Sequence, residues 1–262
     1  MMRTLVKNKN GFTLIELLMA MVTGMIVLAG IYVAFNSQQK IHTREQQVVD
    51  AAQNVRVAAQ FMTREIRLAG MDETGLAGAG FLVAGPHAIQ FTLDRDDDED
   101  VADADEDISY GFAAAADTDA DGLSDSGAAP IIRAGTGNDR LAEDIYAIGF
   151  AYAFDNDGDG ELDFVDGDGD GVLDAGEEIW AYDSDAGGDL DWDNDNGVAL
   201  ASAVTFDKIR AVRVWILART RQPLRGYSGP KSFIVGDKPI NLNDNFKYRL
   251  LTTTVKCRNM GI

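Results

Sequence analysis

The sequence has few of the residues on which many proteins of this size depend. It has 262 residues and one cysteine, Cys257, so no disulfide can form within the chain. Its two histidines, His42 and His87, lie in neither a HExxH motif nor a nucleophile motif. None of its five prolines falls between Phe12 and Ala69, so nothing there interrupts a helix. These shortages exclude a disulfide scaffold, and we predict no enzymatic activity.

Positive charge is scarce in the middle of the chain. Between Asp94 and Asp195 there are 34 acidic residues and three basic ones, whereas the rest of the chain has 9 acidic and 20 basic residues. Such a segment repels phosphate, so we expect no nucleic-acid partner. It favours the binding of cations instead.

The first half of the N-terminal region is strongly apolar. The 24 residues from Phe12 to Phe35 carry a single charge, Glu16. As a helix they would span about 36 Å, enough to cross the hydrocarbon core of a bilayer. Arg3, Lys7 and Lys9 precede the run, which predicts a cytoplasmic N-terminus. A plain membrane anchor would explain the apolar run but not a carboxylate inside it.

The junction between the basic leader and this run reads Gly11-Phe12-Thr13-Leu14-Ile15-Glu16. It resembles the class III signal of type IV prepilins and pseudopilins. The resemblance implies that a prepilin peptidase cuts between Gly11 and Phe12 and that Phe12 is then N-methylated. It also implies that Glu16 pairs with the N-terminal amine of a neighbouring subunit during assembly. An ordinary secretory signal fits poorly, because no small-residue cleavage site follows the apolar run.

The helix is predicted to continue beyond the membrane to Ala69, with Gly70 as its left-handed cap. Apolar residues recur every three or four positions and predict a stripe that packs on a globular domain, namely Val48, Ala52, Val55, Ala59, Met62 and Ile66. The domain boundaries that follow are a leader at 1–11, a transmembrane helix at 12–35, its amphipathic continuation at 36–70 and a β-rich periplasmic domain at 71–262.

After a glycine-rich loop from Gly75 to Gly85, the pattern changes to the alternation typical of strands. Strands are predicted at 89–93, 108–112, 145–154, 179–182, 209–218 and 248–256. One long helix followed by strands predicts an α+β fold in which the helix packs on an antiparallel sheet. Acidic insertions occupy about 94–195.

Two further segments, 61–71 and 248–259, resemble minor pilins of the PilW family. This resemblance implies a pilin-like fold and a single-pass protein of the bacterial inner membrane that reaches the pilus or cell surface after assembly. It implies a minor pilin that primes type IV pilus assembly near the tip. The implied partners are the prepilin peptidase, other minor pilins, the major pilin, the inner-membrane assembly platform and membrane lipid. A J-type pseudopilin of type II secretion and a pilin-anchored, calcium-dependent adhesin remain alternatives.

Two overlapping twelve-residue windows match the EF-hand loop, with acids at positions 1, 3, 5, 9 and 12 and glycine at position 6. Alternate residues of such a loop supply oxygen ligands to calcium, so we predict one or two Ca²⁺ ions. The predicted ligands are Asp155, Asp157, Asp159, Glu161, Asp163 and Asp166 in the first window and Asp166, Asp168, Asp170, Val172, Asp174 and Glu177 in the second. No flanking helices are expected, so the loops belong to a β domain.

Weaker matches lie nearer the N-terminus. Asp117, Asp119, Asp121 and Asp125 occupy positions 1, 3, 5 and 9 of a window that lacks an acid at position 12. Asp94, Asp96, Asp98 and Asp105 occupy positions 1, 3, 5 and 12 of a window that lacks the glycine. The segment from Asp183 to Asp195 is acidic but shows no clear register.

Overall fold

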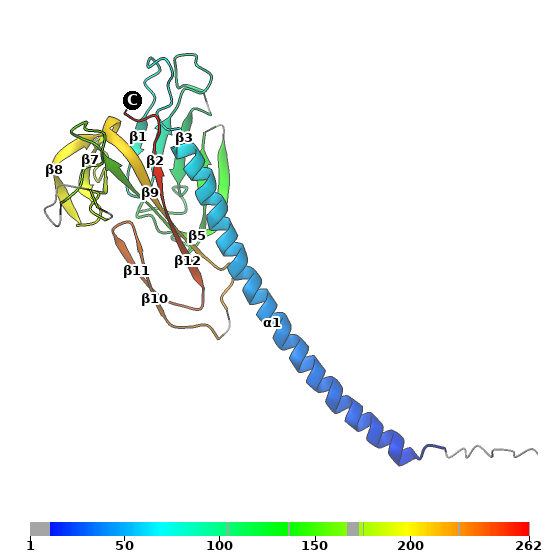
Figure 1. Cartoon of the computed structure of the whole chain (residues 1–262). Coiled ribbons are helices and arrows are strands. Elements are labelled where there is room, and N and C mark those ends of the chain that lie inside the picture. Colours follow the sequence, from blue (N-terminus) through cyan, green and yellow to red (C-terminus); the bar gives the residue numbers. More distant parts are fainter. Residues whose placement is uncertain are drawn as a thin grey trace, which may run out of the picture. The chain divides into compact units, whose positions relative to one another are not determined.

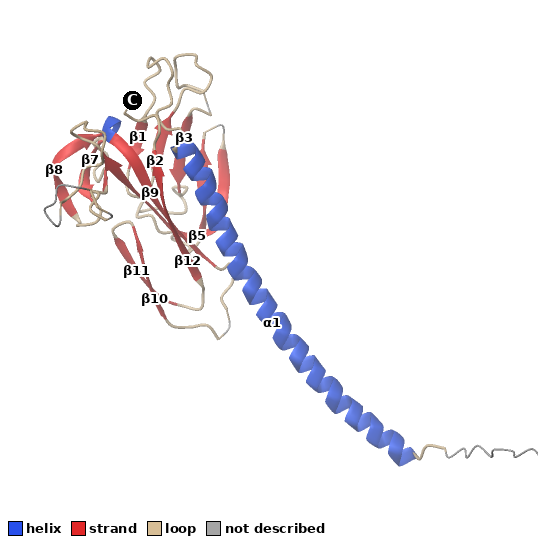
Figure 2. Ribbon diagram, in the orientation of Figure 1, coloured by secondary structure: helices blue, strands red, loops and turns tan. Residues whose placement is uncertain are grey.

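The computed structural model describes residues 11–103, 105–135, 137–166, 173–174, 176–224 and 226–261. The chain divides into two compact units, Met1–Gln46 and Gln47–Ile262. A single helix, α1 (Leu14–Ile66), begins in the first unit and ends in the second (Figure 1). Among the described residues, the rest of the second unit consists of strands, loops and one short 3₁₀ helix (Figure 2).

Among the described residues, ten strands form one antiparallel sheet and two more form a separate hairpin. The sheet strands are β1 (Phe81–Ala84), β2 (Ile89–Thr92), β3 (Asp107–Gly111), β4 (Ala129–Ala134), β5 (Asn138–Phe154), β6 (Ala181–Tyr182), β7 (Asp189–Asp193), β8 (Val198–Thr205), β9 (Ile209–Arg219) and β12 (Tyr248–Lys256). The hairpin consists of β10 (Pro230–Val235) and β11 (Lys238–Asn243), and a short 3₁₀ helix, η1 (Phe206–Lys208), precedes β9.

The long strand β5 organises the sheet. Ile145 pairs with Ala129 of β4 on one edge and with Ala218 of β9 on the other. Near the end of the strand, Tyr152 pairs with β6 and, on the other edge, with β9. The strands β4 and β6 therefore follow one another along a single edge of β5, while β9 occupies the opposite edge and pairs in turn with β12.

One face of this sheet is covered by the last part of α1. The helix buries Ala51, Val55, Ala58, Ala59, Met62 and Ile66. Most of these pack in one core with sheet residues such as Phe91, Ile148 and Val214. The predicted stripe is thus confirmed at its C-terminal end, whereas Val48 and Ala52 are only half-buried. The long helix packed on an antiparallel sheet is the α+β fold that the sequence predicted.

The other face of the sheet also has a core. Alternate residues of β9 point to opposite sides, so Val212, Val214 and Ile216 join the core beneath α1 while Trp215 and Leu217 join a second one. The β10–β11 hairpin contributes Val235 and Ile240 to this second core. Both faces of the sheet are therefore buried at β9.

Several predicted boundaries were wrong. The helix ends at Ile66 and a turn follows, although Gly70 does adopt the predicted left-handed conformation, with φ of +73°. Strand β1 lies inside the segment predicted as a glycine-rich loop. Strands β4, β7, β8, β10 and β11 were also missed, because several of them are short or carry polar and small residues where alternation would be needed.

Candidate calcium loops and assembly helix

The residues predicted for processing precede the first turn of α1. Gly11 and Phe12 lie before the helix and are exposed, with 87% of the Phe12 surface accessible. Thr13 and Glu16 form a reciprocal cap: Glu16 accepts hydrogen bonds from the Thr13 backbone N–H (2.9 Å) and hydroxyl (2.8 Å), and the Glu16 N–H donates to the Thr13 hydroxyl (3.3 Å). The carboxylate is therefore held at the helix N-terminus, where the helix dipole favours negative charge.

The apolar part of α1 is exposed throughout the first unit. Its most apolar 18-residue window has a mean hydropathy of 2.3, and none of that window is buried. By length and composition the helix is able to cross a membrane. In water such a surface would be costly, which is in keeping with a bilayer or a bundle of neighbouring helices around it.

The first predicted calcium loop begins where β5 ends. Asp155 is buried, and its carboxylate accepts hydrogen bonds from the backbone N–H groups of Gly158 (2.7 Å) and Gly160 (3.3 Å). Asp163 accepts the N–H of Asn156 (3.0 Å). These bonds fold the loop back on itself, and one carboxylate oxygen each of Asp155, Asp157 and Asp163 lies within 4.8 Å of the others.

This grouping has the spacing and the oxygen chemistry that a hard divalent cation requires. Burial, followed by the neighbouring carboxylates, raises the pKa of Asp163, although the hydrogen bond from Asn156 acts in the opposite direction. Asp155 also lies 3.7 Å from the Arg210 guanidinium. The predicted ligands Asp159 and Glu161 are exposed and lie outside the three-residue group, and so does Asp166.

The second predicted loop is only partly described. Asp168, Asp170 and Val172 lie outside the described residues. Of the remaining predicted ligands, Glu177 accepts a hydrogen bond from the Asp174 N–H (3.0 Å). Phe164 pairs with Glu178 in an isolated bridge, which brings the end of the first window beside the end of the second.

The weaker match at Asp117 folds in the same way as the first loop. One oxygen each of Asp117, Asp119 and Asp121 forms a group within 4.8 Å. Asp125 instead accepts both the N–H (3.0 Å) and the hydroxyl (2.7 Å) of Thr118. These bonds lower the pKa of Asp125, whereas desolvation and the neighbouring Asp121 raise the pKa of Asp119.

Four acidic connections share one backbone design. They begin at Asp94, Asp117, Asp155 and Asp183, and in each the first carboxylate accepts the N–H of the sixth residue. The fourth and sixth residues have positive φ in every loop; they are Asp97 and Glu99, Ala120 and Gly122, Gly158 and Gly160, and Ala186 and Gly188. In the first three of these loops, one carboxylate oxygen of the first residue lies within 4.8 Å of one of the third residue.

The fourth of these loops was missed by sequence reasoning. Asp183 accepts the N–H of Gly188 (3.0 Å), and Asp191 accepts the N–H of Ser184 (2.7 Å). The fifth position is Gly187 rather than an acid, which hid the register. The glycine at position 6 and the buried Leu190 at position 8 were the signals that could have revealed it. In the Asp94 loop, Asp105 at position 12 of the window pairs with Arg95 (3.7 Å), and the neighbouring Glu106 belongs to the acidic group.

A partly buried ion pair joins α1 to the sheet, and no sequence pattern predicted it. The Arg133 guanidinium of β4 donates to both carboxylate oxygens of Glu65, with its Nε 2.9 Å from Oε2 and its Nη2 3.1 Å from Oε1. The Tyr110 hydroxyl of β3 donates to the same carboxylate. Burial and this carboxylate raise the pKa of Tyr110, so the phenol stays protonated. The three groups fix the last turns of the helix against two strands.

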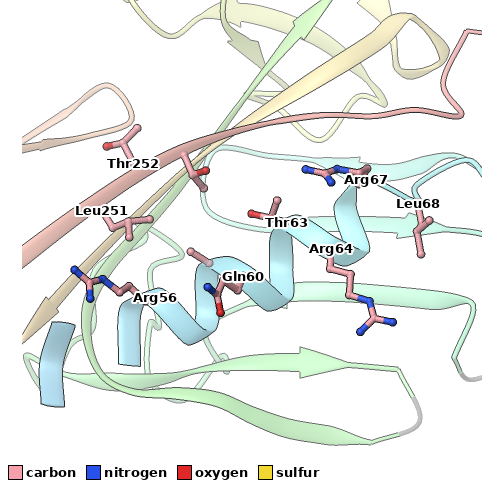
Figure 3. Close-up of a pocket in the computed structure, with 10 residues that line it drawn as sticks. Arg56, Gln60, Thr63, Arg64, Arg67, Leu68, Leu251 and Thr252 are labelled. Atoms are coloured by element: carbon pink, nitrogen blue, oxygen red, sulfur yellow. The ribbon is translucent and has the colours of Figure 1, made fainter. Parts of the chain in front are cut away.

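A groove of about 690 Å³ lies between the final turns of α1 and β12 (Figure 3). Arg56, Arg64 and Arg67 line it together with Leu251 and Thr252. The groove thus presents cations beside apolar atoms, in contrast to the carboxylates of the loops.

The remaining candidates for chemistry are buried or isolated. Cys257 at the end of β12 is buried and unpaired, and burial raises the pKa of its thiol to about 12. Burial and Lys238 lower the pKa of His87. Among the described residues, neither histidine belongs to a group that could hold a metal.

Comparison with known proteins gives two matches along the chain. The family model described as type IV pilus-assembly protein W matches residues 113–259, and the prokaryotic N-terminal methylation motif matches residues 6–32. Among solved structures, the chain is similar to the type IV-like pilin TTHA1219 from Thermus thermophilus, with 15% identity and a TM-score of 0.46. That likeness covers 80% of this chain and 98% of the other. No curated protein sequence matches the chain.

Proposed function

This chain belongs to the family of type IV pilus-assembly protein W, and we propose that this minor pilin helps to start filament assembly near the pilus tip. The observation that carries the proposal is the presence in one chain of an N-terminal methylation motif and a pilus-assembly domain over more than half of the sequence. Pilins are structural proteins, and the family implies processing by a prepilin peptidase followed by assembly with other pilus components.

We place the processing site between Gly11 and Phe12. Both residues are exposed and lie ahead of the first helical residue, Leu14, so a peptidase would not have to unwind the helix to reach the bond. Cleavage would leave Phe12 as a new N-terminus, the residue that we expect to be methylated. The apolar part of α1 would remain in the inner membrane, and the β-rich domain would lie on the periplasmic side.

Glu16 is the residue proposed to guide assembly. Its carboxylate lies one turn from the new N-terminus and is held by Thr13 alone within the described chain. An unpaired carboxylate costs a few kcal/mol in lipid, so a positively charged amine from a neighbouring subunit is a favourable partner. Such a contact would set the axial register between this subunit and the next pilin.

Calcium is proposed as a stabiliser of the β-rich domain. The support is the donor set of the first loop, three carboxylates that converge within 4.8 Å on a loop closed by backbone N–H bonds. Without a cation these charges repel one another, and a bound ion would stabilise the folded state by mass action. Magnesium fits less well, because it retains waters and rarely binds in all-protein cages.

The assembly role is tested in a strain that lacks this gene. Surface pili are counted by electron microscopy, and secreted proteins are assayed in parallel. We expect few or no pili with secretion intact, and complementation with the wild-type chain should restore them. Normal pili with blocked secretion would overturn the proposal and favour a type II pseudopilin. Normal pili and secretion with lost surface attachment would favour an adhesin.

The same strain tests Glu16. Complementation with Glu16→Ala should fail to restore pili although the protein accumulates in the membrane, because the pairing with the neighbouring amine is lost. The matched control is Glu45→Ala, which removes an exposed carboxylate from the same helix. Pili restored to wild-type numbers by Glu16→Ala would contradict the assigned role.

A further inference from the structure

Two buried acids lie at the two ends of the connection between β2 and β3. Asp94 has no accessible surface, and Glu106 retains 1% of its own. The Leu93 N–H donates to the Glu106 carbonyl (3.0 Å), which closes the base of the connection. The Asp94 N–H donates to the carbonyl of Met71 (2.7 Å), so the same point is attached to the segment that leaves α1.

Carboxylates gather at this base. One oxygen each of Asp94, Asp96 and Glu106 lies within 4.8 Å of the others. Asp98 approaches as well, because it forms a similar group with Asp100 and Glu106. The Asp94 carboxylate is positioned by backbone N–H groups of Asp97 (2.7 Å) and Glu99 (3.3 Å).

Glu106 supplies a second and independent observation. Its Oε1 accepts the Arg95 N–H (2.6 Å), but its Oε2 is buried and has no hydrogen-bond partner. A carboxylate oxygen buried without a donor loses its hydration and receives nothing in return, which is costly. Such an atom, on a carboxylate that belongs to an acidic group, indicates a partner that the polypeptide does not provide.

The described residues offer no cation to this group. Arg95 is the basic residue of the connection, and its side chain pairs with Asp105 at 3.7 Å, where both groups are about half exposed. Within the described part of the chain, no lysine or arginine forms an ion pair with Asp94, Asp96 or Glu106. Buried negative charge of this kind is normally paired or bound to metal.

We propose that Asp94, Asp96 and Glu106 bind a divalent cation, with calcium as the best fit because it accepts several carboxylate oxygens in a flexible coordination geometry. The free oxygen of Glu106 would coordinate the ion. The ion would thereby stabilise the β2–β3 connection where it contacts Met71, in the segment that follows α1. This site is separate from the loop at Asp155, and it does not depend on the role proposed for the protein in pili.

The test is a calorimetric titration of the full-length chain in detergent with CaCl₂. Glu106→Gln keeps the shape of the side chain but removes its charge, and we expect it to bind one calcium ion fewer than the wild type. Asp105→Asn is the matched control, because it removes the same charge from the neighbouring, half-exposed residue. It should bind as many ions as the wild type. Equal binding by Glu106→Gln and the wild type would overturn the proposal.

Two more variants keep the test decisive. Asp96→Asn changes an exposed side chain, so it should fold normally and still lose the same ion; retention of that ion would contradict the site. Asp157→Asn addresses the loop at Asp155 instead. If Asp157→Asn loses an ion while Asp96→Asn and Glu106→Gln do not, the new site fails and the other loop stands. If the pattern is reversed, the new site stands and the calcium loop proposed at Asp155 fails.

Discussion

Glu106 is a buried carboxylate and Glu65 is a partly buried one, and the two are compensated in different ways. Glu65 receives hydrogen bonds from Arg133 and Tyr110, so its charge is neutralised by the chain itself. Glu106 receives one backbone N–H and keeps a buried oxygen without a partner. One part of the domain thus compensates its own charge, whereas we propose that the acidic connections depend on a cation from the medium.

The largest effect is expected at the self-compensated carboxylate. Glu65→Ala leaves the partly buried Arg133 guanidinium without its partner, which should lower the free energy of unfolding by about 2–3 kcal/mol. The loss should be the same in calcium and in chelator. Chemical denaturation of the full-length chain measures it, with the exposed Glu73→Ala as the control. A loss seen only in calcium or only in chelator would contradict the proposed difference between Glu65 and Glu106.

A smaller effect, and one that depends on the medium, is expected in the first calcium loop. Asp157→Asn removes one of three converging carboxylates, and it should weaken calcium binding at that site by roughly tenfold or more. Its free energy of unfolding should fall below that of the wild type only when calcium is present. Asp139→Asn changes an exposed carboxylate on β5 and serves as the control. A deficit of equal size in chelator would show that Asp157 acts without an ion.

The smallest effect on stability is expected at Cys257, whose acidic thiol is buried in its protonated, neutral form. Burial raises the pKa of the Cys257 thiol to about 12, above its ordinary value of 9. The folded state therefore resists ionisation, so its stability is complete below pH 9 and declines as the pH rises from 9 towards 12. Replacement by Ala should reduce that decline, as measured by unfolding at pH 8 and pH 10.

The same burial predicts slow thiol chemistry. At pH 8 the denatured chain should react with a thiol reagent at least about tenfold faster than the native chain. The thiolate is the reactive form, and burial lowers its population in the native chain. Equal rates in the two states would mean that Cys257 is accessible, and it would then be available for a disulfide between subunits.

The parts of the molecule that the sequence predicted well are those set by local spacing. The motif from Gly11 to Glu16, the apolar run behind it and the stripe that ends at Ile66 all depend on residues a few positions apart. The acidic loop at Asp155 was also visible, because its turn is determined by glycines within the loop itself.

The parts that could not be predicted depend on distant pairs. Glu65 meets Arg133 only after the helix has docked on β4, and nothing near either residue indicates the contact. Glu106 was passed over in favour of Asp105, since the two acids are adjacent and only the fold determines which one turns inward. The register at Asp183 was hidden by a glycine in a place where an acid was expected.

We propose that calcium from outside the chain holds the acidic connections together, and the thermal unfolding of the full-length protein tests this claim. The midpoint is measured in detergent with CaCl₂, with MgCl₂ and with a chelator. At a hundredfold excess over the dissociation constant, one calcium ion contributes about 2.7 kcal/mol, which corresponds to a rise of roughly 5–10 °C over the chelated protein. Magnesium should give a smaller rise. A midpoint that is the same in calcium and in chelator would contradict the claim.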